Sequence, residues 1–146
     1  MDRFERSTII NRPLEEVFPV LANLENDPKW RREFVEARKT SDGPIGIGTR
    51  FSLFGEFLGR RGEVVYKVSE YEPNRITAWK TVSGPLPLTF RRSFEGVEGG
   101  TQVTIRYEGE MGSFFSLMKP LLISMARRAL EGDLPKVKEM MEARAL

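Results

Sequence analysis

The sequence has 146 residues, and its 23 basic side chains nearly balance its 21 acidic ones, so the formal net charge is +2. Hydrophobic residues make up 40% of the chain, enough for a buried core, and the small net charge excludes the basic footprint of a nucleic-acid-binding protein. The absence of Cys and His excludes disulfides, a thiol nucleophile, a Ser-His-Asp triad and the commonest metal ligands. We expect one domain over residues 1–146, with no metal or cofactor.

The N-terminal segment predicts a strand followed by two short helices. Residues 4–10 have the composition of a first strand. Asn11 is suited to cap a helix that has Pro13 in its first turn, and Pro19 should shorten or bend that helix. A second short helix is expected over residues 24–30.

The middle of the chain predicts six further strands. Apolar and polar residues alternate there with the two-residue period of a half-buried strand. Turns containing Gly, Pro or Asn separate these segments, and the Gly99-Gly100 pair predicts a tight turn. The expected strands cover residues 34–39, 49–54, 63–71, 75–83, 88–95 and 101–110.

The C-terminal segment predicts one long amphipathic helix over residues 113–146. Gly132 is a poor helix former and Pro135 lacks a backbone N–H, so we expect a kink or break there, with Asp133 capping a restarted helix. An amphipathic helix that follows a single curved antiparallel sheet can pack only against that sheet, which gives an α+β fold. The expected apolar face consists of Phe114, Leu117, Met118, Leu121, Leu122, Met125, Ala129 and Leu130.

The order of these elements, with the residues at their corners, resembles the START-like superfamily. Within it, the chain is most similar to the bacterial polyketide cyclase/dehydrase-type lipid-binding (SRPBCC) branch. The resemblance implies a helix-grip fold, in which a seven-stranded antiparallel sheet wraps around the long C-terminal helix and leaves a cavity between them. The segments that carry it are INRPLEEVF (10–18), DPKW (27–30), GIGTRF (46–51), VSEYEP (68–73), FE (94–95) followed by GGT (99–101), and DL (133–134) with KVKEMM (136–141).

This fold would place several apolar side chains around the cavity. The register of Trp79 is ambiguous, because Ile76 and Ala78 favour the opposite orientation of their strand. Each candidate could instead belong to ordinary core packing. The candidates for the ligand-binding wall are Phe51, Leu53, Tyr66, Trp79, Phe90, Arg92, Tyr107, Met118, Leu122 and Met125.

Arg92 is the polar candidate among them. It alternates with Leu88, Phe90 and Phe94, and therefore falls on an otherwise apolar face. An unpaired guanidinium would not stay buried there. Arg92 therefore pairs with an inward carboxylate or phenol, binds an anionic group of a ligand, or extends to an open end.

Three functions fit this reading of the sequence. The first is a non-enzymatic protein that binds or carries an apolar or amphipathic small molecule, such as a lipid, polyketide or isoprenoid. The second is a polyketide cyclase or dehydratase that uses Tyr66, Tyr107 and Arg92. The third is a partner-binding module with a vestigial cavity. The sequence names neither the ligand nor the oligomeric state.

The cellular location and membrane contact follow from the charged segments. The first residues are charged, unlike a signal peptide, and no run of about 18 apolar residues could span a bilayer, so we expect a cytoplasmic protein. The pattern predicts a solvated helix face at Lys119, Arg127 and Arg128. Weak contact of these side chains with anionic lipid is the alternative. An apolar and basic tip, formed by Phe54, Phe57 and Leu58 beside Arg60 and Arg61, could cover the cavity, touch a membrane or simply pack on a neighbour.

Overall fold

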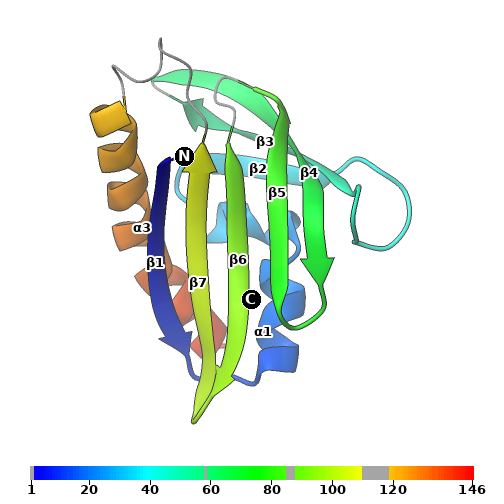
Figure 1. Ribbon diagram of the computed structural model, residues 1–146, viewed down its shortest axis with the longest axis vertical. Coiled ribbons are helices and arrows are strands. Elements are labelled where there is room, and N and C mark those ends of the chain that lie inside the picture. The colour runs from blue at the N-terminus through cyan, green and yellow to red at the C-terminus, as the bar shows by residue number, and fades with distance from the viewer. Residues whose placement is uncertain (1, 58, 85–87, 110–118) are drawn as a thin grey trace.

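The computed structural model describes residues 2–57, 59–84, 88–109 and 119–146 (Figure 1). The chain forms a strand, two short helices, six strands and a long helix, as the sequence predicts. The elements are β1 (Asp2–Ile10), α1 (Leu14–Leu21), the 3₁₀ helix η1 (Leu24–Lys29), β2 (Phe34–Lys39), β3 (Arg50–Phe57), β4 (Arg60–Glu72), β5 (Ile76–Ser83), β6 (Thr89–Val97), β7 (Gly100–Gly109) and α3 (Lys119–Glu142).

The seven strands form one antiparallel sheet in the order β1-β7-β6-β5-β4-β3-β2. β1 and β2 lie at opposite edges, so α1 and η1 carry the chain across the sheet between them. Figure 1 shows that α1 and α3 cover the same face of the sheet, with α3 beside β1. The α+β helix-grip fold expected from the sequence is confirmed.

The start of α1 differs from the expectation. No side chain caps this helix, and Pro13 occupies the position before its first residue. Asn11 is too far from that position to act as the cap. Its backbone N–H instead donates to a carboxylate oxygen of Glu142 at 2.9 Å, which ties the end of β1 to the end of α3.

The expected break in the C-terminal helix is wrong, and the kink expected there as the alternative stays a prediction. α3 continues without interruption from Lys119 to Glu142, with Pro135 inside it. Asp133 is buried within the helix and caps no new start. Proline removes one backbone hydrogen bond, whereas the packing of Leu134 and Val137 against the sheet holds the turns on both sides of it. Residues 113–118 lie outside the described part of the chain.

The face that α3 turns toward the sheet also differs from the expected one. Leu121 is 53% exposed and Met125 is 39% exposed, whereas Leu130 is buried as expected. The side chains that do pack against the sheet recur every three or four residues on the opposite side of the helix. They are Ile123, Ala126, Leu130, Leu134, Val137 and Met141.

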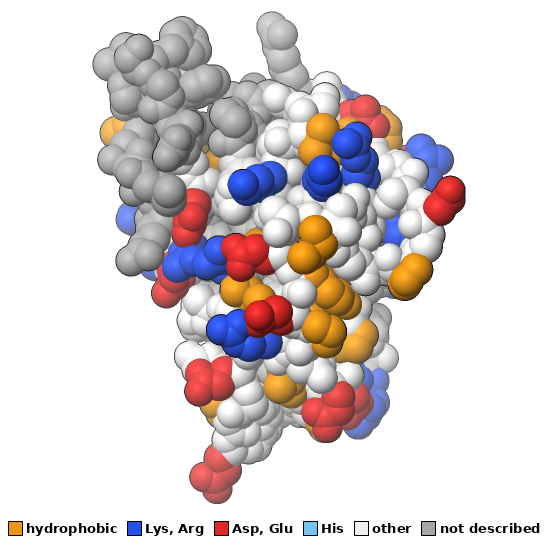
Figure 2. Space-filling view, turned by 45° about the vertical axis from the view of Figure 1, so that its right-hand side comes forward, with side chains coloured by type: hydrophobic (Ala, Val, Ile, Leu, Met, Phe, Trp, Pro, Cys, Tyr) orange, Lys and Arg blue, Asp and Glu red, His pale blue; other side chains and the backbone are white. Residues whose placement is uncertain are grey.

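The core consists of two clusters on the helix-covered face of the sheet. The first joins α3 and α1 to β1, β6 and β7, through residues such as Phe18, Ile105 and Leu134. The second lies under β3 to β6 and contains Phe51 and Trp79. Figure 2 shows the opposite, outer face, where basic and acidic side chains are interspersed around a hydrophobic stretch.

Pairing with β6 settles the register of β5, because Trp79 lies opposite Phe90 and Ala78 opposite Arg91. The pairing of β4 with β5 shifts between Val68 and Glu70, directly opposite Trp79 and Ala78. Trp79 then points into the second core cluster, while Ala78 is buried as well. Simple alternation gave two conflicting answers for this strand because Ala78 is buried on the face opposite to that of Trp79.

Candidate ligand-binding site

A row of aromatic side chains crosses the helix-covered face of the sheet. Strand pairing places Phe51 opposite Tyr66, Trp79 opposite Phe90, and Phe90 opposite Tyr107. The ring centroids of Trp79 and Phe90 lie 4.7 Å apart in a stacked arrangement, and Tyr66 meets Phe90 edge-on at the same distance. Such pairs add about 0.5–1.5 kcal/mol each beyond their buried area. The row is therefore a firm apolar wall.

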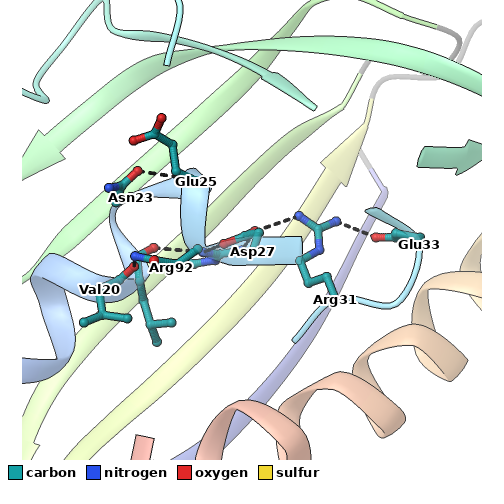
Figure 3. A network of polar contacts seen from close by, with 9 residues as sticks. Val20, Asn23, Glu25, Asp27, Arg31, Glu33 and Arg92 are labelled. Carbon is teal, nitrogen blue, oxygen red and sulfur yellow. Dashed lines mark hydrogen bonds and ion pairs between the residues drawn. The ribbon is translucent and has the colours of Figure 1, made fainter. Parts of the chain in front are cut away.

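A buried ion-pair network lies beside this wall (Figure 3). Asp27 of η1 is completely buried and accepts hydrogen bonds from Arg92 on both carboxylate oxygens, with Nη1–Oδ1 at 3.0 Å and Nη2–Oδ2 at 2.5 Å. The same Asp27 accepts a bond of 3.1 Å from Nη1 of Arg31. Nη2 of Arg31 donates to Glu33 at 2.6 Å. Two guanidinium groups thus share two carboxylates.

Arg92 sits at the boundary between the two core clusters. Its Nη1 also donates to the backbone carbonyl of Leu21 at 2.8 Å, which binds the end of α1 to β6. Its guanidinium carbon lies 4.9 Å from the ring centroid of Trp30 and 5.1 Å from that of Trp79. These rings face a charge that has little contact with water, which is where cation–π contacts are strongest.

Two phenols lie within electrostatic reach of Arg31. Burial raises the pKa of both Tyr66 and Tyr107, and the positive charge of Arg31 offsets part of that rise. Both phenols are therefore protonated at neutral pH and can donate a hydrogen bond. Within the described ranges, no hydrogen bond uses either hydroxyl group. Burial of Arg31 lowers its pKa, because it disfavours the charged form. The interactions with Tyr107, Glu33 and Asp27 outweigh burial and hold the pKa of Arg31 well above its ordinary value.

Asp133 brings a further carboxyl group from α3 to this region. Burial raises its pKa from 3.8 to about 6, while Arg31 lowers it in part and Glu33 raises it further. Its Oδ1 atom has no hydrogen-bond partner in the described part of the chain, and Nε of Arg32 lies 3.9 Å away. Gly132 leaves room for that arginine, because a Cβ at this position would lie 2.8 Å from its Nη2.

A shallow hollow of about 530 Å³ lies elsewhere, at the turn between β4 and β5 and on the outer side of β6 and β7. Its lining includes Ser93, Glu95, Gln102 and Thr104, whose positions alternate with the inward-facing Phe94 and Val103. This open surface mixes polar and apolar groups and would leave an apolar molecule in contact with water. The aromatic row with its phenols is the better candidate.

The described ranges hold no group of three or more acidic side chains that could bind a metal ion. No helix in those same ranges is long and apolar enough to cross a membrane.

The sequence matches the model of the family described as polyketide cyclase / dehydrase and lipid transport, over residues 1–142. The chain belongs to this family. No curated protein matches its sequence.

Solved structures with the fold of this polyketide cyclase/dehydrase and lipid transport family member have low sequence identity to it. An aromatase/cyclase from Streptomyces sp. R1128 has a TM-score of 0.79 at 15% identity, over 99% of this chain and 96% of that one. A protein from Thermus thermophilus has a TM-score of 0.79 at 17% identity, over 99% of this chain and 100% of that one. A START superfamily protein from Mycobacterium smegmatis has a TM-score of 0.73 at 15% identity, over 97% and 95% of the two chains. At these identities the likeness shows the fold alone.

The structure brings together most of the side chains that the sequence suggested as the lining of a cavity. Arg92 adjoins the row through Trp79, and Met125 lies apart on the exposed side of α3. Met118 and the side chain of Leu122 are outside the described part of the structure. The side chains that meet at the aromatic row are Phe51, Leu53, Tyr66, Trp79, Phe90 and Tyr107. Their role in ligand binding stays a prediction.

Sequence reasoning missed Asp27, Arg31 and Asp133. The four-residue spacing from Asp27 to Arg31 was a signal for a helical ion pair. A second signal was that a buried Arg92 needs a partner such as a buried carboxylate. In the structure Asp27 is that partner. Nothing local to Asp133 indicated that its carboxyl group would be buried, because a helix restart at that position would have exposed it.

Proposed function

We propose that this protein binds and carries an apolar or amphipathic small molecule between the sheet and α3. The apolar part of the molecule would lie along the aromatic row that includes Phe90, and its polar end would meet the phenols of Tyr66 and Tyr107. The observation that carries this proposal is that the aromatic row contains two protonated phenols, Tyr66 and Tyr107, with no hydrogen-bond partner in the described ranges. The family's description, which includes lipid transport, supports it.

The charges around the phenols favour a neutral polar end. The guanidinium groups of Arg31 and Arg92 are matched by the carboxylates of Asp27 and Glu33, so no uncompensated positive charge is left for an anion. A hydroxyl or carbonyl oxygen accepts a hydrogen bond from a phenol without bringing a charge into a buried site. Recognition of an anion by Arg92 would first require its bonds to Asp27 to break.

The test is a calorimetric titration with a long-chain alcohol and the carboxylic acid of equal length. We expect the alcohol to bind more tightly, and Tyr66→Phe or Tyr107→Phe to weaken its binding by roughly 2- to 10-fold, the value of one hydrogen bond. Tyr71→Phe is the matched control, because Tyr71 packs against Phe18 beside both clusters and should leave binding unchanged.

Other outcomes of the same titration contradict the proposal. If the acid binds more tightly and Arg92→Met removes only that preference, the ligand is an anion recognised by Arg92. If neither compound binds and native mass spectrometry of freshly purified protein shows no bound small molecule, the carrier function is wrong.

A second candidate function is a polyketide cyclase or dehydratase. The observation that favours it is the same pair of protonated phenols near Arg31, since a phenol can donate to a carbonyl or enolate oxygen as negative charge develops there. An enzyme would convert a poly-β-keto thioester into a cyclised or dehydrated product, whereas a carrier would release it unchanged.

A further inference from the structure

The first half of α3 exposes an apolar surface that the fold does not use. The helix already packs one stripe against the sheet, through residues such as Ile123 and Leu130. Leu121 and Met125 lie one turn apart on the opposite side and are 53% and 39% exposed. This half of the helix is therefore apolar on two opposite faces, which packing against a single sheet does not require.

The charged side chains along this half of α3 have one sign. Residues 111–130 contain no Asp or Glu but include Lys119, Arg127 and Arg128. Both arginines are exposed, and neither forms an ion pair within the described ranges. Residues 131–142, by contrast, carry four acidic and two basic side chains.

Positive charge continues along the same side of the helix. Leu121, Met125, Arg128 and Gly132 are spaced by four, three and four residues, so they form one line along α3. At Gly132 the guanidinium of Arg32 lies against the helix, with its side chain 71% exposed and its Nε 3.9 Å from a carboxylate oxygen of Asp133, which leaves its outer nitrogens free, within the described ranges, to meet a phosphate. The line thus begins with two apolar side chains and ends with two guanidinium groups.

We propose that this line on α3 binds the surface of an anionic lipid bilayer. Leu121 and Met125 would enter the boundary between head groups and acyl chains, and Arg128 and Arg32 would contact phosphate groups. A second copy of the same face would offer these arginines no acidic partner from residues 119–130, whereas an anionic lipid surface offers phosphate groups, so charge complementarity favours the bilayer. The proposal stands apart from the ligand-binding function and does not depend on it.

The test is co-sedimentation with vesicles of phosphatidylcholine, with and without phosphatidylglycerol, at low and high salt. We expect binding only when phosphatidylglycerol is present, and less binding at high salt. Leu121→Gln should weaken binding roughly tenfold, because it removes an apolar side chain that the bilayer would bury. Arg128→Gln should weaken it roughly fivefold, the contribution of one basic residue near an anionic surface.

Two substitutions on β2 serve as matched controls. Val35 is 75% exposed and Arg38 is also exposed, so Val35→Gln and Arg38→Gln remove the same kinds of group from another element. Both should leave vesicle binding unchanged. Met125→Gln is the second test variant if Leu121→Gln fails to fold.

Three results would overturn the proposal. One is no sedimentation with anionic vesicles at low salt, and another is an equal loss in the β2 controls. The third is a stable dimer in light scattering that Leu121→Gln dissociates, which would assign the face to a second copy of the chain.

Discussion

At the scale of single residues, Arg92 shows how a charge can stay on an apolar face. Its side chain is 1% exposed, yet Asp27 and the carbonyl of Leu21 accept its hydrogen bonds. Desolvating two charges is costly, and their attraction repays that cost only when the bonding geometry is good. Two parallel bonds from the guanidinium fork to one carboxylate meet that condition.

Removing Arg92 should therefore destabilise the fold strongly. Arg92→Met leaves the Asp27 carboxylate buried beside a single arginine, and we expect the free energy of unfolding to fall by about 3–5 kcal/mol. Urea unfolding measures the change. Arg91→Met is the matched control on the same strand, because Arg91 pairs with the partly exposed Glu70 on the other side of the sheet, and it should cost about 1 kcal/mol or less. Equal losses for the two variants would contradict a special role for the buried pair.

The raised pKa of Asp133 makes stability depend on pH. In the folded state this pKa is about 6, against an ordinary value of 3.8, so the native protein keeps a proton that the unfolded chain has already released between these pH values. The protonated Asp133 carboxyl group therefore contributes to the free energy of unfolding. This contribution is present in full below about pH 4 and is lost as pH rises through about 6.

Asp133→Asn removes this titration. We expect wild type to lose on the order of 2 kcal/mol of stability relative to Asp133→Asn between pH 4 and pH 7, as measured by urea unfolding. Asp42→Asn, in the exposed loop before β3, is the control. Its free energy of unfolding should change with pH in the same way as that of wild type. A wild-type curve that gains stability relative to Asp133→Asn over this interval would reverse the assignment.

At the scale of elements, α3 illustrates the limit of local rules. The helix propensities of Gly132 and Pro135 favour an interruption, but the inward stripe of apolar residues continues through both. The same stripe could have been read from the sequence at residues 123, 126, 130, 134, 137 and 141. The alternative stripe through Leu121 and Met125 was equally regular, and only contact with the sheet distinguishes them.

A continuous helix predicts that Pro135→Ala stabilises the protein. Alanine restores the backbone bond to the carbonyl of Glu131 and favours the helix, so we expect a gain of about 1–3 kcal/mol in urea unfolding. Lys136→Ala, the exposed neighbour, should change stability by less than about 0.5 kcal/mol. No gain from Pro135→Ala would mean that the helix has already relaxed around the proline.

At the scale of the whole molecule, the path of the chain creates the site. Because β1 and β2 occupy opposite edges of the sheet, α1 and η1 must cross its helix-covered face. That crossing delivers Asp27 and Arg31 to the interior, where they meet Arg92 of β6. The aromatic row and the ion-pair network are neighbours for this reason, although they come from distant parts of the sequence.

The sequence by itself determined the elements, their order and the inward face of most strands. Alternation, turn residues and helical spacing are properties of neighbouring residues, so Phe51, Tyr66 and Phe90 could be placed on one face without coordinates. Only the tertiary structure decided which carboxylate meets Arg92, which side of α3 faces the sheet, and that Asp133 is buried. Asp27 and Arg92 are 65 residues apart, and their contact depends on how the chain crosses the sheet, which no local pattern encodes.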